Sequence, residues 1–79
     1  MDLYFEHSDR RRTLVAENVS FEEVFDLIHA DVEKRNPNFK IYYMRHWMRK
    51  GEYCYDFGSH TEFYILTPKG DHNAPHLRN

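Results

Sequence analysis

Apolar and polar positions alternate in two short runs near the start of the chain. Leu3 and Phe5 belong to the first run, Leu14 and Ala16 to the second, and the charged stretch 8–11 separates them. Alternation at every second residue is the pattern of a strand that buries one face. We therefore expect two strands joined as a hairpin.

The period becomes helical after Ser20. Ser20 and Glu23 have the spacing of a capping box, in which each side chain accepts a hydrogen bond from the other residue's backbone N–H. Apolar side chains then recur every three or four positions: Phe21, Val24, Phe25, Ile28 and Val32. Because the residue before Pro37 is disfavoured in helical backbone, we expect an amphipathic helix from Ser20 to near Arg35.

Tyrosine, methionine and tryptophan dominate the stretch 40–47, and the turn residues 49–51 separate it from 52–57. This pattern predicts a second hairpin. Alternation in the first strand offers two rows, one with Tyr43 and Trp47 and the other with Met44 and Met48. A single helix cannot cover both rows.

Residues 60–67 have two interpretations. The β-rich stretch 63–67 favours a strand, whereas Ser59 and Glu62 have the spacing of another capping box and could open a short helix. We favour the strand. A three-residue loop 59–61 would place Tyr55 on the side of Ile65, whereas a two-residue loop 58–59 would reverse that parity; we favour the longer loop.

The expected element order is β-β-α-β-β-β. Its simplest burial solution is a two-layer α+β domain, in which one amphipathic helix packs on a mostly antiparallel sheet. We assign residues 1–67 to this single domain. Residues 68–79, with two prolines and few large apolar side chains, are expected to form a flexible C-terminal tail.

Composition narrows the function classes. The chain has 79 residues, 41% of them hydrophobic, a net charge of -2 and a single cysteine, Cys54. Intramolecular disulfides are therefore excluded, and no signal-peptide or membrane-spanning pattern is present. We expect a cytoplasmic protein with no membrane association. The near-neutral balance also lacks the basic footprint of a dedicated duplex binder.

An aromatic and basic sheet face left uncovered by the helix would be typical of a protein contact surface, where Tyr, Trp and Arg contribute much of the binding energy. The candidate contact residues are Tyr43, Arg45, Trp47, Arg49, His60, Arg10, Arg11 and Arg12. The alternative is that these aromatic residues lie on a solvated sheet face and bind no partner. A second copy of the chain could bury the same face, so self-association is also expected.

Other chemistry has weaker support. The three consecutive arginines with nearby tyrosines could contact nucleic acid. His46, Cys54, Asp56 and His60 carry atoms that bind zinc or form a nucleophile with its base, but their spacing matches no metal or catalytic motif. We expect no catalytic residues, no metal and no cofactor.

The segment 56–64 contains Asp56, Gly58, Ser59 and Glu62, followed by two aromatic residues. It resembles a pattern in small uncharacterised proteins of phages and prophages from Gram-positive bacteria. Within the segment, Gly58 can adopt a positive φ, and Asp56, Ser59 and Glu62 can bind backbone amides, so we expect these four residues to hold a turn.

The resemblance implies a phage-type accessory protein of unknown activity. Together with the contact residues, it leads to the expectation of a non-enzymatic protein that binds a host or phage protein in the host cytoplasm. Such binding could inhibit a host defence or replication enzyme. A nucleic-acid-binding accessory protein that uses Arg10–Arg12 is the alternative.

Overall fold

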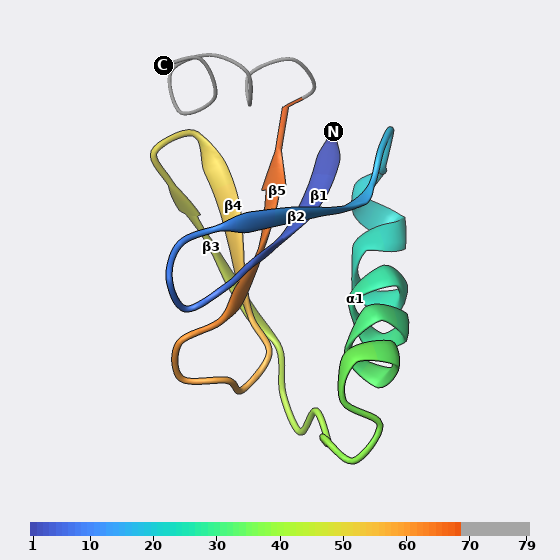
Figure 1. Cartoon of the computed structure of the whole chain (residues 1–79). Coiled ribbons are helices and arrows are strands. Elements are labelled where there is room, and N and C mark those ends of the chain that lie inside the picture. The colour runs from blue at the N-terminus through green and yellow to red at the C-terminus, as the bar shows by residue number, and fades with distance from the viewer. Residues whose placement is uncertain (69–79) are drawn as a thin grey trace.

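The computed structural model describes residues 1–68, which form one helix and five strands (Figure 1). The elements are β1 (Asp2–Glu6), β2 (Arg12–Ala16), α1 (Phe21–Arg35), β3 (Arg45–Arg49), β4 (Glu52–Asp56) and β5 (Phe63–Thr67). The predicted fold class, α+β with the order β-β-α-β-β-β, is confirmed.

The five strands form one sheet in the order β2-β1-β5-β4-β3, and every neighbouring pair is antiparallel. Pairing of β1 with β5 joins the two ends of the described chain at the centre of the sheet. This arrangement leaves β2 and β3 as the two edge strands. Both predicted hairpins are present.

The turn between β3 and β4 has a clear local cause. Lys50 and Gly51 both have a positive φ, 52° and 80°, which is the signature of a two-residue type I′ turn. Glycine adopts this backbone without steric cost. The turn fixes Arg49 opposite Glu52 and so sets the register of the whole hairpin.

The helix begins and ends where the sequence predicts. The backbone N–H of Ser20 donates to the carboxylate of Glu23 at 2.9 Å, which is the glutamate half of the capping box. At the other end, the N–H of Asn36 donates to the carbonyl of Val32 at 2.8 Å. Acidic residues in the first turn and basic residues in the last turn also suit the helix dipole.

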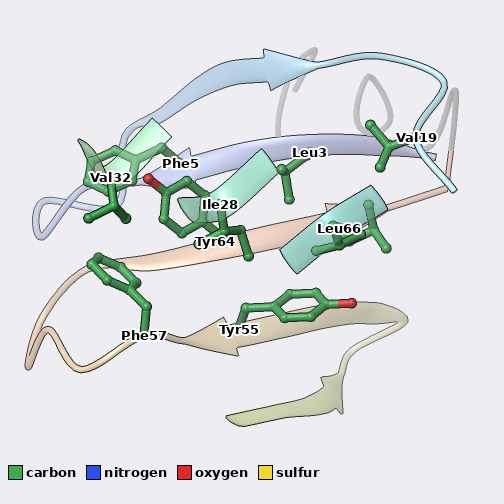
Figure 2. Close-up of a cluster of buried hydrophobic side chains, with 10 residues drawn as sticks. Leu3, Phe5, Val19, Ile28, Val32, Tyr55, Phe57, Tyr64 and Leu66 are labelled. Atoms are coloured by element: carbon green, nitrogen blue, oxygen red, sulfur yellow. The ribbon is translucent and has the colours of Figure 1, made fainter. Parts of the chain in front are cut away.

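The hydrophobic core lies between α1 and one face of the sheet (Figure 2). The sheet contributes Leu3, Phe5, Tyr55, Tyr64 and Leu66, the loop after β4 contributes Phe57, and the opposite layer contributes Val19, Val24, Ile28 and Val32. Burial of these side chains is the main stabilising contribution to the fold. Phe21 and Phe25 were predicted to share this helix face, but they lie at its margin and remain 49% and 45% exposed.

Two boundaries differ from the prediction. The third strand begins at Arg45 rather than near Lys40, because its register pairs Arg45 with Asp56, the last residue of β4. Residues 41–44 therefore pair with no strand in the described part of the chain. The predicted tail 68–79 lies, apart from Pro68, outside the described residues.

The loop between β4 and β5 also corrects the sequence prediction. It spans residues 57–62, longer than either predicted loop, and it places Tyr55 opposite Tyr64 rather than on the side of Ile65. The cause is Phe57, which leaves the strand and packs its ring 5.6 Å from that of Phe39. The strand interpretation of 63–67 is confirmed.

The only helix among residues 1–68, α1, is neither long nor apolar enough to span a bilayer.

Candidate functional site

The sheet face opposite α1 carries a continuous apolar row. Strand pairing aligns Leu14, Tyr4, Ile65, Cys54 and Trp47 from β2 across to β3. Among residues 1–68, no helix covers this face, and side chains of the sheet itself lie over its centre. The central residues Cys54 and Ile65 are nevertheless fully buried.

Four charged side chains shield the centre of this row, and we call them the ionic roof: Glu6, Arg12, Arg49 and Glu52. Arg12 donates two hydrogen bonds to the Glu52 carboxylate, at 2.8 and 3.0 Å, and a third to Glu6 at 3.3 Å. Arg49 lies 3.7 Å from Glu6. A bidentate pair of this kind is stronger than a single contact between point charges.

The ionic roof requires a strongly coiled sheet. Arg12 lies on β2 and Glu52 on β4, with β1 and β5 between them in the sheet. Their direct contact shows that β2 bends over the face, and Figure 1 shows β2 crossing in front of β4 and β5. The right-handed twist of the strands produces such an approach of opposite corners.

The electrostatic consequences are local. The hydrogen bond to Glu52 is the main factor that raises the pKa of Arg12, so this guanidinium stays charged. Burial raises the pKa of the Cys54 thiol. A buried thiol with a raised pKa has little thiolate at neutral pH and is a poor nucleophile.

The exposed aromatic and basic side chains gather instead around β3. We define the β3 surface by Tyr43, Arg45, His46, Trp47 and Met48, together with Phe21 and Phe25 of α1. All seven residues are exposed, with Trp47 40% and Met48 55% accessible. Residues 45–48 of β3 are exposed on both faces because α1 packs over the other strands, whereas Arg49 at the end of β3 belongs to the ionic roof.

Aromatic contacts on both faces of the sheet orient the side chains of the β3 surface. The rings of Phe21 and Tyr53 meet edge to face at 4.9 Å, and the ring of Phe25 lies 6.3 Å from that of His46. On the sheet face away from α1, the rings of Trp47 and Phe63 lie 6.4 Å apart, centre to centre. These contacts fix the orientation of side chains that remain open to solvent.

Arg45 supplies the positive charge of the β3 surface. Its side chain is 69% exposed, donates to the Asp56 carboxylate at 2.7 Å and lies 5.3 Å from the centre of the Tyr43 ring. Burial by itself raises the pKa of Asp56, but hydrogen bonds from Arg45 and from the backbone N–H of Gly58 lower it below its ordinary value. The pair therefore stays ionised at neutral pH.

The predicted turn residues tie the 57–62 loop together. Asp56 accepts the N–H of Gly58 at 2.9 Å, and the Ser59 hydroxyl accepts the N–H of Glu62 at 3.3 Å. Gly58 has φ +109°, which disfavours a larger side chain. His60 is exposed in this loop and is not part of the β3 surface.

A hollow of about 420 Å³ lies beside this loop and the end of α1. Its lining includes the aromatic rings of Phe5, Phe39, Phe57 and Tyr64 and the polar side chains of His7, Arg35, Ser59 and Glu62. His7 is hydrogen-bonded to Thr13 at 2.8 Å, and Arg35 donates to Asp31 at 2.5 Å. Internal contacts thus engage polar groups that a ligand would otherwise use.

Asp31 is a structural residue that the sequence reasoning missed. It lies on the buried side of α1, where its carboxylate accepts hydrogen bonds from the Tyr64 hydroxyl at 2.7 Å and from Arg35. Its position three residues after Ile28, within the apolar stripe, was the available signal. Burial, followed by the hydrogen bond to Asp31, raises the pKa of Tyr64.

The three consecutive arginines do not form one patch. Arg10 and Arg11 lie in the exposed turn between β1 and β2, where Arg11 is 3.5 Å from Asp9, whereas Arg12 is held in the ionic roof. Arg49 is likewise engaged with the roof. Of the predicted contact residues, the structure therefore brings together Tyr43, Arg45 and Trp47.

The candidate metal ligands do not gather into a metal site within residues 1–68. No three His, Cys, Asp or Glu side chains in this part of the chain gather as a metal site requires. His46 faces the helix side of the sheet and Cys54 the opposite side, because each is paired in a different row.

The charge distribution along the chain adds to the basic character of the predicted contact face. Residues 40–51 contain four basic side chains, Lys40, Arg45, Arg49 and Lys50, and no acidic one, although the whole chain carries a net charge of -2. This segment contains β3. The β3 surface is therefore both aromatic and locally cationic.

Comparisons with protein-family models, with curated proteins and with solved structures found no match to this chain.

Proposed function

We propose that this protein is a non-enzymatic interaction protein that binds another protein through the β3 surface. The observation that carries the proposal is the concentration of exposed aromatic and basic side chains on one edge strand. Tyr, Trp and Arg are the residue types that contribute most to protein interfaces. Exposed large apolar side chains lie on both faces of this edge strand, and exposed apolar surface of this kind is typical of a contact site.

The nature of the partner rests on the resemblance of segment 56–64 to phage and prophage proteins. On that basis we propose that the partner is a host or phage protein and that binding alters its activity. Inhibition of a host defence or replication enzyme is the form of this proposal that fits a small accessory protein.

Nucleic-acid binding is the second candidate. The basic segment 40–51 and its exposed tyrosines favour it, because aromatic rings can stack on bases beside a cationic strip. The position of Arg12 in the ionic roof weakens it, since this guanidinium is only 21% exposed and already contacts two carboxylates. We therefore rank protein binding first.

A pull-down from a Gram-positive bacterial lysate tests the proposal. Tagged wild-type protein is compared with Tyr43→Ala and Trp47→Ala, in lysate halves with and without nuclease, and retained proteins are identified by mass spectrometry. We expect the wild type to retain the same protein in both halves. Each substitution should weaken retention roughly fivefold or more, the effect of truncating an interface anchor.

Leu14→Ala is the matched control, because Leu14 is 46% exposed on the opposite edge strand. It should retain the partner as the wild type does. Loss of every retained protein after nuclease treatment would overturn the proposal and favour nucleic-acid binding. Equal retention by the wild type and both variants would show that the partner does not bind through the β3 surface.

A further inference from the structure

This inference rests on the proposed function and specifies its binding mode. We propose that the open edge of β3 binds an extended, acidic segment of the partner protein, which adds a sixth strand to the sheet. In such an addition, main-chain hydrogen bonds supply affinity and alternate side chains supply specificity.

The register of the β3–β4 hairpin identifies the backbone groups that face outward. A two-residue turn closes on a hydrogen-bonded pair, here Arg49 and Glu52, and such pairs alternate along an antiparallel ladder. Arg45 and Trp47 therefore bond to β4, whereas His46 and Met48 direct their N–H and C=O groups away from it. Among residues 1–68, no strand pairs with that side of β3.

The two edges of the sheet are not equivalent. β2 has a register shift opposite Leu3 and Tyr4, and such irregularities discourage the addition of another strand. β3 pairs without interruption over all five residues and contains no proline. It is also flanked by the exposed rings and thioether of the β3 surface, against which a new strand could pack.

Charge selects the occupant. β3 and its turn carry Arg45, Arg49 and Lys50 with no acidic residue among 45–51. Arg45 and Arg49 each contact one carboxylate, that of Asp56 and that of Glu6, but their side chains remain 69% and 37% exposed and have N–H donors for a further carboxylate. Full antiparallel pairing of two copies of β3 around a two-fold axis would place Arg45 opposite the second copy's Arg49, which is destabilising. An incoming strand with acidic residues opposite the arginines and an apolar residue opposite Trp47 avoids this repulsion.

Selection from a library of random decapeptides displayed on phage tests this inference. The library is selected on immobilised wild-type protein, and the enriched peptide is synthesised for binding measurements. We expect enriched sequences with aspartate or glutamate at alternate positions and apolar residues between them. No enrichment, or enrichment of basic sequences, would overturn the inference.

Met48→Pro and Met48→Ala form a matched pair. Proline removes the outward N–H of Met48 and leaves the β4 ladder intact, whereas alanine shortens the side chain and keeps the N–H. We expect Met48→Pro to bind the selected peptide at least tenfold more weakly than Met48→Ala. Equal binding by the two variants would contradict strand addition.

Hydrogen exchange with the selected peptide gives a second measurement on the wild-type protein. The amides of His46 and Met48 should exchange at least tenfold more slowly in the complex than in the free protein. Binding without protection of these two amides would show that the peptide uses another surface and would overturn the inference.

The inference and the proposed function can fail separately. A lysate partner that Tyr43→Ala loses but Met48→Pro retains would leave the proposed function standing and overturn strand addition. A wild-type protein that retains no lysate protein but binds acidic peptides at the edge would support strand addition and count against the proposed cellular function. Binding of single-stranded oligonucleotides in place of acidic peptides would overturn both.

Discussion

At the scale of single residues, a buried polar contact holds the helix to the sheet. The Tyr64 hydroxyl donates to Asp31 at 2.7 Å, and Arg35 donates to the same carboxylate while its guanidinium lies 4.0 Å from the centre of the Phe5 ring. Removing one partner from a buried hydrogen bond exposes the other to the full desolvation cost. This contact joins α1 to β5 and β1.

Tyr64→Phe should lower the free energy of unfolding by about 1–3 kcal/mol, because it removes the hydroxyl and leaves the Asp31 carboxylate with one donor fewer. Urea denaturation measures the change. Tyr42→Phe is the control, since Tyr42 is 85% exposed and should change stability by less than about 0.5 kcal/mol. Equal stability of the two variants would show that the buried contact contributes nothing.

Asp56 makes stability depend on pH at the acid end. Its pKa is lowered in the folded protein by Arg45 and Gly58, which outweigh burial, so the ionised form stabilises the fold at pH values above about 4, the ordinary range of an aspartate. This stabilisation is lost as the pH falls through the lowered pKa. The stability advantage of wild type over Asp56→Asn should therefore shrink below about pH 4.

Denaturation curves at several pH values between about 2 and 7 test this dependence. Asp26→Asn removes the same charge from an exposed site and serves as the control. A difference between wild type and Asp56→Asn that is constant from pH 7 to pH 2 would contradict the assigned role of the carboxylate.

At the scale of elements, the ionic roof explains how an uncovered sheet face can bury Cys54 and Ile65. It ties edge strand β2 to β4 through Arg12 and Glu52, which are 40 residues apart in sequence. Because the roof consists of charged groups, its carboxylates depend on the guanidinium groups for compensation. Loss of Arg12 would leave two partly buried carboxylates with reduced pairing.

Arg12→Ala should lower the free energy of unfolding by about 2 kcal/mol, a value below that of a fully buried pair because the Arg12 side chain is 21% exposed. Thermal or urea denaturation measures it. Arg11→Ala, at an exposed position of the adjacent turn, should change stability by less than about 0.5 kcal/mol. A similar effect of both substitutions would show that the ionic roof does not contribute specifically to the stability of the fold.

Local sequence signals predicted most of the helices and strands, but they predicted less of how the strands pair and which side chains share a face. The Ser20–Glu23 pair and the Lys50–Gly51 turn act over a few residues, so the ends of α1 and the β3–β4 hairpin could be predicted. The parity of β4 and β5 could not, because it depends on Phe57 leaving the strand to pack against Phe39. That contact joins distant parts of the chain.

At the scale of the whole molecule, packing divides the sheet into three regions. The helix covers one face, the ionic roof closes the centre of the other, and β3 remains exposed on both sides. The sequence identified Tyr43, Arg45 and Trp47 as contact candidates from their residue types and alternation. It could not reveal that Arg12 and Arg49 form part of the ionic roof, since the roof forms only when the coiled sheet brings β2 over β4.

Residue-resolved hydrogen exchange on the free protein tests most directly whether the β3 edge is available to a partner. The amides of His46 and Met48 should exchange fast, whereas that of Trp47, which bonds to β4, and those of Ile65 and Leu66 in the centre of the sheet should be protected. Alternating protection along β3 is the predicted result. Protection of His46 and Met48 equal to that of Trp47 would show that the edge is already covered and would contradict the account.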